Sequence, residues 1–144
     1  MTDPQIRLVK NSWNILRQID PLLIGDVFYS KLFVAYPKLE SLFTSSRESQ
    51  SAKLIDTLSM LVSGLDDTPA LEEELSQLAI RHIRYGVKHV DYDAVGEALL
   101  WTIRQALGSD WNEEMGLAWT ACYNMIAATM IAATAENNSD HGIK

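Results

Sequence analysis

Apolar residues along this chain recur every three or four positions, the spacing that places them on one face of an α-helix. Five stripes of this kind can be traced, separated by polar or helix-breaking residues. They are Ile6, Val9, Trp13 and Leu16; Leu54, Leu58, Leu61 and Leu65; Leu75, Leu78, Ala79 and His82; Tyr92, Val95, Leu99, Ile103 and Ala106; and Met115, Ala118, Trp119, Cys122 and Ile126. No stretch alternates polar and apolar residues for long enough to predict a strand, so the pattern predicts an all-α protein.

Proline and glycine indicate where these helices begin and end. All four prolines stand at expected helix starts, where the missing N–H is not needed; they are Pro4, Pro21, Pro37 and Pro69. Three glycines follow periodic stretches, where a helix end favours a left-handed residue; they are Gly64, Gly86 and Gly108. We expect six long helices and one short helix, at residues 4–18, 21–36, 38–43, 50–65, 69–84, 92–107 and 111–135, with the serine-rich segment 45–51 as a loop.

The overall composition narrows the class of protein. A chain of 144 residues predicts one domain, residues 1–144, and its net charge of -7 argues against nucleic acid or an anionic membrane as partner. The single cysteine, Cys122, has no internal disulfide partner, which favours the reducing cytoplasm. Charged residues near the N-terminus predict no signal peptide, and the longest apolar run, 125–135, is shorter than the about 20 residues that span a bilayer. We therefore expect no membrane insertion.

One histidine lies on an apolar helix face. His82 is in phase with Leu75, Leu78 and Ala79, whereas His89 lies in an expected loop and His141 in a polar tail. From its position alone, His82 is either a core histidine bonded to a backbone carbonyl or a metal ligand.

Longer motifs resemble one known family. The stretch Arg81-His82-Ile83-Arg84-Tyr85-Gly86-Val87, followed by Tyr92, is similar to the proximal segment of bacterial globins. Upstream, Phe28-Tyr29-x-x-Leu32-Phe33-x-x-Tyr36-Pro37-x-Leu39-x-x-Leu42-Phe43 resembles their second helix and the corner after it. The resemblance runs from about residue 5 to residue 135 and is strongest to flavohaemoglobin-like single-domain globins. It implies a globin fold, with helices crossing around a pocket that holds haem b.

On the proximal side, the resemblance implies that His82 is the iron ligand, and haem iron commonly takes one imidazole there. Tyr92 matches a tyrosine beside that imidazole; it either orients the ring or simply fills the core between two helices. Phe43 matches a phenylalanine on the haem face, or is a generic core aromatic. Thr134 stands where flavohaemoglobins have a glutamate, and Glu136 falls on a different side of the helix. We therefore expect no strongly electron-donating imidazole and no strong peroxidase-like chemistry.

On the distal side, the resemblance places Gln50 at the usual position of a distal histidine and Leu54 over the iron. These two residues are four apart and share a helix face. Tyr29 matches a distal tyrosine, and with Gln50 it could donate hydrogen bonds to electron-rich bound O2. Lys53 and Arg47 either reach the haem propionates or are surface charges. Gly25 lies one turn before Tyr29 and Ser51 follows Gln50, and globins usually place small residues where these two helices cross closely. Alternatively, Gly25 only weakens its helix.

Three other classes of protein are considered. A two-iron bundle enzyme needs Glu-x-x-His pairs, and this chain has none. A bilin carrier would attach its pigment at Cys122, but this cysteine lies on a buried stripe, which suits packing better. A haem-free globin-like signalling domain would have no need to keep His82, Tyr29 and Gln50 in register. We predict a five-coordinate ferrous haem that binds O2, CO and NO reversibly. The alternatives are an NO dioxygenase that uses an external electron-donating reductase, and a haem-based gas sensor.

Overall fold

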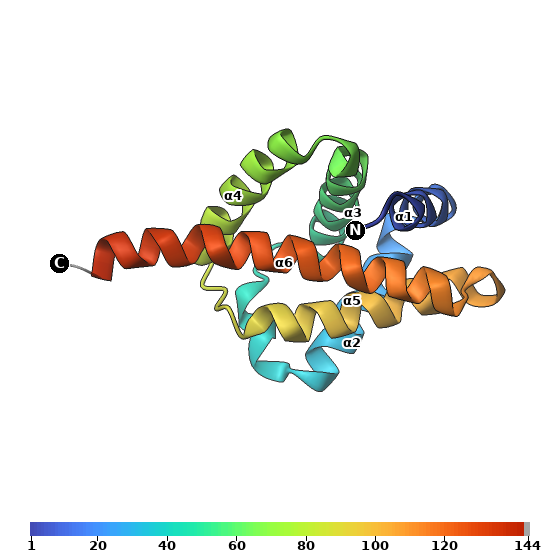
Figure 1. Ribbon diagram of the computed structural model, residues 1–144. Coiled ribbons are helices and arrows are strands. Elements are labelled where there is room, and N and C mark those ends of the chain that lie inside the picture. The colour runs from blue at the N-terminus through green and yellow to red at the C-terminus, as the bar shows by residue number, and fades with distance from the viewer. Residues whose placement is uncertain (143–144) are drawn as a thin grey trace.

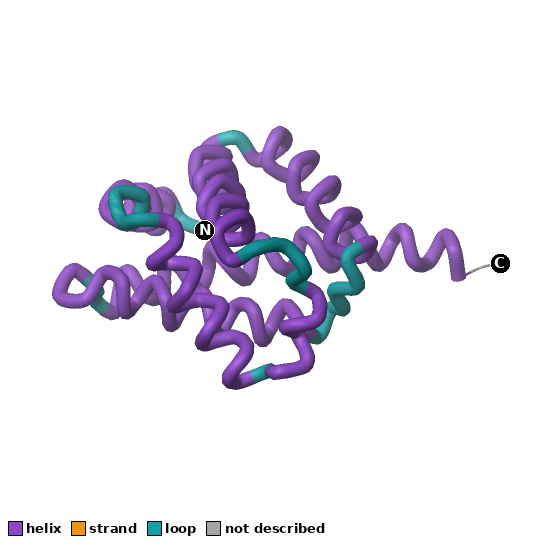
Figure 2. The backbone as a smooth tube through the Cα atoms, turned by 180° about the vertical axis from the view of Figure 1, so that it is seen from behind, coloured by secondary structure: helices purple, strands orange, loops and turns teal. Residues whose placement is uncertain are grey.

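The structure is a computed structural model that describes the backbone of residues 1–142 and the side chains of residues 1–135, so Glu136 and His141 lie outside the described side chains. Within that range the chain forms six α-helices and three short 3-10 helices, with no strand. They are α1 (Asp3–Leu16), α2 (Pro21–Ala35), η1 (Pro37–Leu42), α3 (Arg47–Ser63), η2 (Gly64–Asp66), α4 (Thr68–Arg84), α5 (Asp91–Leu107), η3 (Gly108–Asp110) and α6 (Glu113–Gly142). The predicted all-α class is confirmed, and short loops join the helices throughout (Figure 2).

The expected helix boundaries are mostly correct. Each of the four prolines lies in the first turn of an element, as predicted. Gly86 and Gly108 have positive φ angles of 93° and 53°, which is the conformation expected after a helix end. The expectation of a left-handed residue at Gly64 is wrong. Its φ is -83°, a right-handed value, because the chain passes directly from α3 into the 3-10 helix η2.

The serine-rich segment 45–51 is not a loop. Helix α3 already begins at Arg47, because the Ser46 hydroxyl accepts a hydrogen bond from the Ser49 backbone N–H and caps the helix. The serines that looked like loop residues therefore start the helix. As a consequence, Gln50 lies in the first turn of α3. Helix α6 also differs from the expectation, since it continues past residue 135 to Gly142.

The helices pack in two groups around α6. Figure 1 shows α6 crossing the whole molecule, with α3 and α4 on one side of it and α2 and α5 on the other. Helix α3 packs mainly on α2, while α4 packs on α6. Helices α3 and α4 are joined at one end by η2 and diverge toward their other ends in both views (Figures 1 and 2). The N-terminus of α3 and the C-terminus of α4 thus lie at the open ends of this pair.

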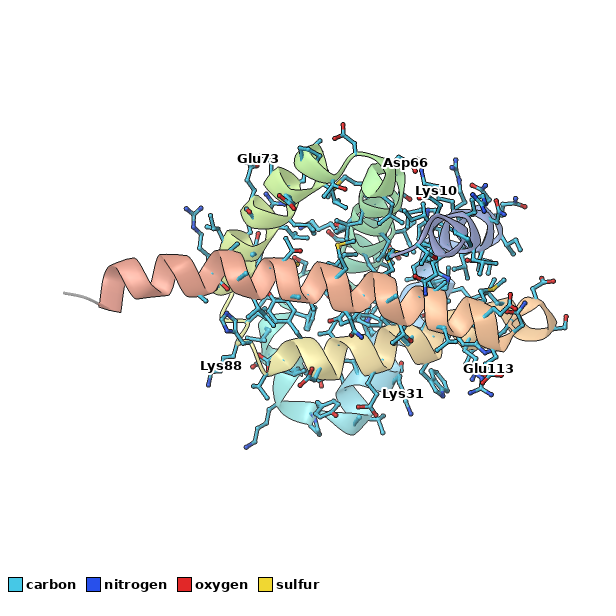
Figure 3. The ribbon with its side chains drawn as sticks, in the orientation of Figure 1. Lys10, Lys31, Asp66, Glu73, Lys88 and Glu113 are labelled. Carbon is cyan, nitrogen blue, oxygen red and sulfur yellow. The ribbon has the colours of Figure 1, made fainter. Side chains whose placement is uncertain are left out.

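Two buried indole N–H groups help to fix the position of α1. The Trp119 Nε1–H donates to Ser12 Oγ at 2.8 Å, and the Trp13 Nε1–H donates to Ser59 Oγ at 3.2 Å. These bonds tie α1 to α6 and to α3. At the surface, Lys10 pairs with Asp66 and ties α1 to η2 (Figure 3). Helix α1 is thus tied to α6, to α3 and to the η2 connection between α3 and α4.

Helix α6 is the one described helix that is long and apolar enough to cross a membrane by length and composition, over Glu113–Ala135. The apolar run 125–135 is too short to span a bilayer, as noted from the sequence, but the whole helix is long enough. Its buried residues, which include Ala118, Trp119 and Met130, pack in the hydrophobic core against α1 and α4. We therefore interpret α6 as a core helix.

Candidate functional site

Helices α2 and α3 approach each other closely at one pair of small residues. A Cβ atom added to Gly25 would lie 1.7 Å from Ser51 Oγ, which no side chain could tolerate without movement. The close crossing expected at Gly25 is therefore present, with Ser51 as its partner. It brings the face of α2 that carries Tyr29 against the first turn of α3, which carries Gln50.

Tyr29 lies in an aromatic cluster beneath this crossing. It is only 4% exposed, and its ring packs edge-on against Phe28 at 4.9 Å and Phe43 at 5.3 Å between centroids, and stacks with Phe33 at 5.9 Å. Its hydroxyl donates to the backbone carbonyl of Gln50 at 3.1 Å. The structure therefore brings Tyr29, Phe43 and Gln50 together, as predicted, but the hydroxyl proton is engaged by a backbone carbonyl.

The environment of Tyr29 keeps its hydroxyl protonated. Burial raises the pKa of Tyr29 to about 12, and the nearby Arg47 guanidinium partly opposes this rise. Arg47 itself is placed in a way that the sequence did not indicate: its Cζ lies 5.3 Å from the Tyr29 ring centroid, and it pairs with Asp26. Arg47 is thus packed on the distal tyrosine, a contact that matches neither alternative considered from the sequence.

The other predicted distal residues are more open to solvent. Phe43, Gln50 and Leu54 are half-buried, so the expectation that Phe43 is buried holds only in part, and Lys53 is exposed. Leu54 and Phe43 still pack against the edge of the core. Among the described residues, the side-chain amide of Gln50 makes no hydrogen bond, so it is available to a ligand.

On α4, the predicted proximal histidine has one nitrogen engaged. His82 Nδ1 is 2.9 Å from the backbone carbonyl oxygen of Leu78, one turn earlier, so Nδ1 carries the proton and donates it. Within the described part of the chain Nε2 has no protein partner, and its lone pair is therefore available. Burial lowers the pKa of His82, the Leu78 bond opposes this effect, and Arg81 adds to it. The imidazole is thus held neutral, the form that binds metal.

Tyr92 lies beside this imidazole, as predicted. The two rings are nearly parallel, at 14°, with 6.5 Å between centroids, and the contact is a stack with no hydrogen bond between the side chains. Helix α6 holds Tyr92 from behind, because the Tyr123 hydroxyl donates to the Tyr92 backbone carbonyl at 2.6 Å.

His89, which was expected to be an ordinary loop residue, makes two contacts that its place in the sequence did not indicate. Its ring packs on Tyr92 at 6.3 Å, and its Nε2 lies 2.6 Å from the hydroxyl of the fully buried Thr134. Tyr92 therefore packs on both His82 and His89. Thr134, which stands where flavohaemoglobins have a glutamate, contacts a loop histidine. The signal in the sequence was a polar residue, Thr134, within the apolar run 125–135, which is too weak to indicate a partner 45 residues away.

The donor set decides which group could bind here. In the described residues no three His, Cys, Asp or Glu side chains are placed to hold a metal ion. One neutral imidazole with a free Nε2 does not hold a bare ion well, but it suffices for an iron whose equatorial positions are filled by a porphyrin. The residues present therefore fit haem. The two-iron alternative lacks its ligands, and a bilin attachment is disfavoured because Cys122 is 2% exposed.

Comparison with known proteins agrees with this class. Residues 26–130 match the Globin family, and the chain therefore belongs to the globin family, which implies a haem cofactor. It is 30% identical over 131 residues to an uncharacterized globin-like protein of Aquifex aeolicus, covering 91% of this chain and 92% of that protein. Among solved structures it is similar to an engineered carbene transferase made from a putative nitric oxide dioxygenase of Rhodothermus marinus, with a TM-score of 0.85, 28% identity and 99% of each chain covered.

A second solved structure supports the bacterial character of the match. It is a bacterial globin from Campylobacter jejuni, which aligns with a TM-score of 0.82 and 25% identity over 96% of this chain and 99% of that one. The predicted globin fold is thus confirmed, and the chain is similar to single-domain bacterial globins over nearly its whole length.

Proposed function

We propose that this globin reversibly binds O2, and also CO and NO, at a b-type haem held by His82, with residues 1–144 forming one globin domain. We further assign it to the flavohaemoglobin-like single-domain group, which includes Hell's Gate globin I. One observation carries the proposal: His82 Nδ1 is bonded to Leu78 while Nε2 is free, which is the arrangement of a single neutral iron ligand. Ferrous haem bound in this way supplies an open iron position for a diatomic ligand.

The distal residues would determine how long a ligand stays. The Tyr29 hydroxyl is a protonated donor at physiological pH, and the amide of Gln50 is a second donor. Leu54 and Phe43 would pack on the haem, and the exposed Lys53 would be available to a propionate. Because the Tyr29 hydroxyl already donates to the Gln50 carbonyl, turning it to a ligand gives up that bond. The loss of the bond to the Gln50 carbonyl therefore offsets part of the free energy that the new hydrogen bond to O2 contributes.

The test is the rate of O2 dissociation in the wild type and in Tyr29→Phe, which keeps the ring and deletes the donor. Bound O2 carries negative charge, and a hydrogen bond to a charged group is worth about 1.5–3 kcal/mol. We expect Tyr29→Phe to release O2 roughly ten-fold faster or more, whereas CO dissociation should change much less because CO carries little charge. Unchanged or slower O2 release in the variant would rule out Tyr29 as the dominant donor.

NO dioxygenation is the second candidate, favoured by the similarity to a protein described as a putative nitric oxide dioxygenase. This activity converts NO and O2 to nitrate and needs one electron per turnover to restore the ferrous state, so an electron-donating reductase would have to act in trans. Consumption of NO by the oxygenated protein, sustained only when a reductase and nicotinamide are added, would support it. If the protein consumes NO in a single turnover and its ferrous state is not restored by the reductase, reversible binding remains the proposed function.

We also propose a cytoplasmic location. The chain has a single cysteine, Cys122, whose side chain is buried and whose pKa is raised by burial to about 12. A thiol in this environment is inert, and the chain uses no disulfide, as expected of a protein that folds in a reducing compartment.

A further inference from the structure

A guanidinium lies on the outer side of the aromatic cluster that holds Tyr29. Arg47, the first residue of α3, has its Cζ 5.3 Å from the centroid of Tyr29 and 5.9 Å from that of Phe33. Its Nη1 donates to Asp26 Oδ1 at 3.2 Å, and Asp26 lies one turn before Tyr29 on α2. One side chain therefore contacts the distal tyrosine, its stacked neighbour and the helix that carries both.

This placement is unfavourable for the helix itself. A positive charge in the first turn of a helix opposes the helix dipole, so an arginine at this position needs compensating contacts. The carboxylate of Asp26 and the faces of two aromatic rings provide them. Lys53 of the same helix is, by contrast, exposed and makes no ion pair or ring contact among the described residues. Arg47 is thus specifically oriented.

The ion pair with Asp26 alone explains little. The side chains of Arg47 and Asp26 are 37% and 54% exposed, and an ion pair so open to solvent stabilises a protein only weakly. The contact with Tyr29 differs, because that ring is buried and its hydroxyl donates to the Gln50 backbone carbonyl in the first turn of α3. A cation over a phenol ring draws electron density from it, which makes the hydroxyl a stronger hydrogen-bond donor.

We propose that Arg47 is a positioning residue of the distal pocket: anchored by Asp26, its guanidinium holds the Tyr29 ring against Phe43 and strengthens the Tyr29 hydroxyl as a donor to bound ligand. The proposal rests on the proposed function, because it takes Tyr29 as the donor. Arg47 acts through Tyr29 and needs no contact with the haem. The lower pKa that Arg47 gives to Tyr29, relative to burial alone, agrees with this role.

The test is Arg47→Gln, made in the wild type and in Tyr29→Phe, with O2 dissociation and the C–O stretching frequency of the CO complex as readouts. Loss of a cation–ring contact corresponds to about a two- to five-fold faster O2 release in the wild-type background. The C–O stretch should rise, because positive potential near the ligand oxygen lowers it. Arg47→Lys, which keeps the charge, should recover part of both effects.

A matched control is available on α2. Lys31 also lies over an aromatic ring, 4.8 Å from the centroid of Trp101, but on the surface shared with α5 (Figure 3). Lys31→Gln removes the same charge and the same kind of contact away from Tyr29, and should leave O2 release and the C–O stretch unchanged. A change equal to that of Arg47→Gln would show a general charge effect and overturn the proposal.

The double variant separates this proposal from the proposed function. In the Tyr29→Phe background, Arg47→Gln should cause no further change in O2 release. If Arg47→Gln has no effect in the wild type, or the same effect in both backgrounds, the role of Arg47 is wrong while Tyr29 remains the donor. If Tyr29→Phe by itself leaves O2 release unchanged, Tyr29 is not the dominant donor and the role of Arg47 fails with it, while reversible binding at a haem held by His82 is not overturned.

Discussion

At the scale of single residues, the two side chains that carry the proposed function each have a pKa shifted by burial. Tyr29 is buried among aromatic rings, which raises the pKa of its phenol, and His82 is half-buried, which lowers the pKa of its imidazole. In both cases burial disfavours the charged form. Burial thus favours a neutral phenol on α2 and a neutral imidazole on α4, the forms that the proposed donor and iron ligand need.

The pH dependence of O2 release follows from the pKa of Tyr29. Because the pKa is raised to about 12, the phenol remains protonated, and remains a donor, well into the alkaline range. We expect the O2 dissociation rate to be flat between about pH 7 and pH 10, measured by stopped-flow on the oxygenated protein. A rise in the rate with an apparent pKa near the ordinary value of tyrosine, about 10, would show that Tyr29 is more exposed in the ligand-bound protein.

Replacement of His82 tests the proximal assignment. We expect His82→Ala to lose stably bound haem, because no other described histidine combines an apolar helix face with a free Nε2. The measurement is haem content per chain after gel filtration, read from the Soret band. His89→Ala serves as the control, since His89 Nε2 is already engaged by Thr134, and this variant should retain its haem. Wild-type haem content and spectrum in His82→Ala would refute the assignment.

At the scale of elements, two helix contacts place these side chains. The crossing of α2 and α3 at Gly25 and Ser51 positions Tyr29 against the first turn of α3. The contact between His89 and Thr134 joins the α4–α5 loop to α6, next to Tyr92. Both contacts depend on small groups, a missing Cβ in one case and a hydroxyl in the other.

The crossing predicts a strong steric effect of one methyl group. In Gly25→Ala the new Cβ would overlap Ser51 Oγ, so the helices must move apart, at a cost of about 1–3 kcal/mol in the free energy of unfolding. Chemical denaturation measures this cost. Tyr29 should also lose its defined position, so O2 release should become faster.

Two further variants make the crossing test specific. Adding Ser51→Gly removes the overlapping atoms, so the double variant should lose less stability than the sum of the two single variants. Gly64→Ala is the control, because its Cβ would meet only the end of the Leu71 side chain, at 3.1 Å. Additive effects of Gly25→Ala and Ser51→Gly would mean that the helices do not touch at this point.

The proximal loop contact predicts a local effect. Thr134→Val keeps the shape and deletes the hydroxyl, so His89 loses its partner and the free energy of unfolding should fall by about 1 kcal/mol. Hydrogen exchange should accelerate for amides of residues 85–90, which the contact holds. Thr134→Ser keeps the hydroxyl and should leave this exchange close to that of the wild type. Equal exchange in Thr134→Val and the wild type would show that the contact does not hold the loop.

At the scale of the whole molecule, the arrangement keeps the two sides of the site apart. Helix α4 is held by α6 and helix α3 by α2, and the two diverge from their connection at η2 (Figure 1). His82 lies near one open end and Gln50 and Leu54 lie near the other. Separate helices, each packed on a different partner, therefore carry the two predicted sides of the site.

This arrangement predicts a five-coordinate ferrous haem in the absence of ligand. No histidine or methionine lies near Leu54 on α3, and an amide such as that of Gln50 is a poor iron ligand. The amine of Lys53 binds iron only when it is deprotonated, and this side chain is exposed to water. The absorption spectrum of the reduced, CO-free protein at neutral pH should be high-spin. A six-coordinate, low-spin spectrum would contradict this prediction.

The sequence by itself determined the helical class, because stripes such as Leu75, Leu78 and Ala79 depend only on local periodicity. It also placed His82 on a buried face, and the resemblance to bacterial globins grouped it with Tyr29, Gln50 and Tyr92. These conclusions rest on spacing along the chain, or on an order of motifs that the family shares.

Only the tertiary structure decided how the side chains meet. The cap at Ser46 brought α3 forward to Arg47, and the packing of α3 on α2 then placed that guanidinium over Tyr29. The bond between His89 and Thr134 joins residues 45 positions apart, and the Tyr29 hydroxyl reaches a backbone carbonyl. Such contacts depend on the angle and distance between helices, which arise from the summed packing of the whole core and leave no periodic signal in the chain.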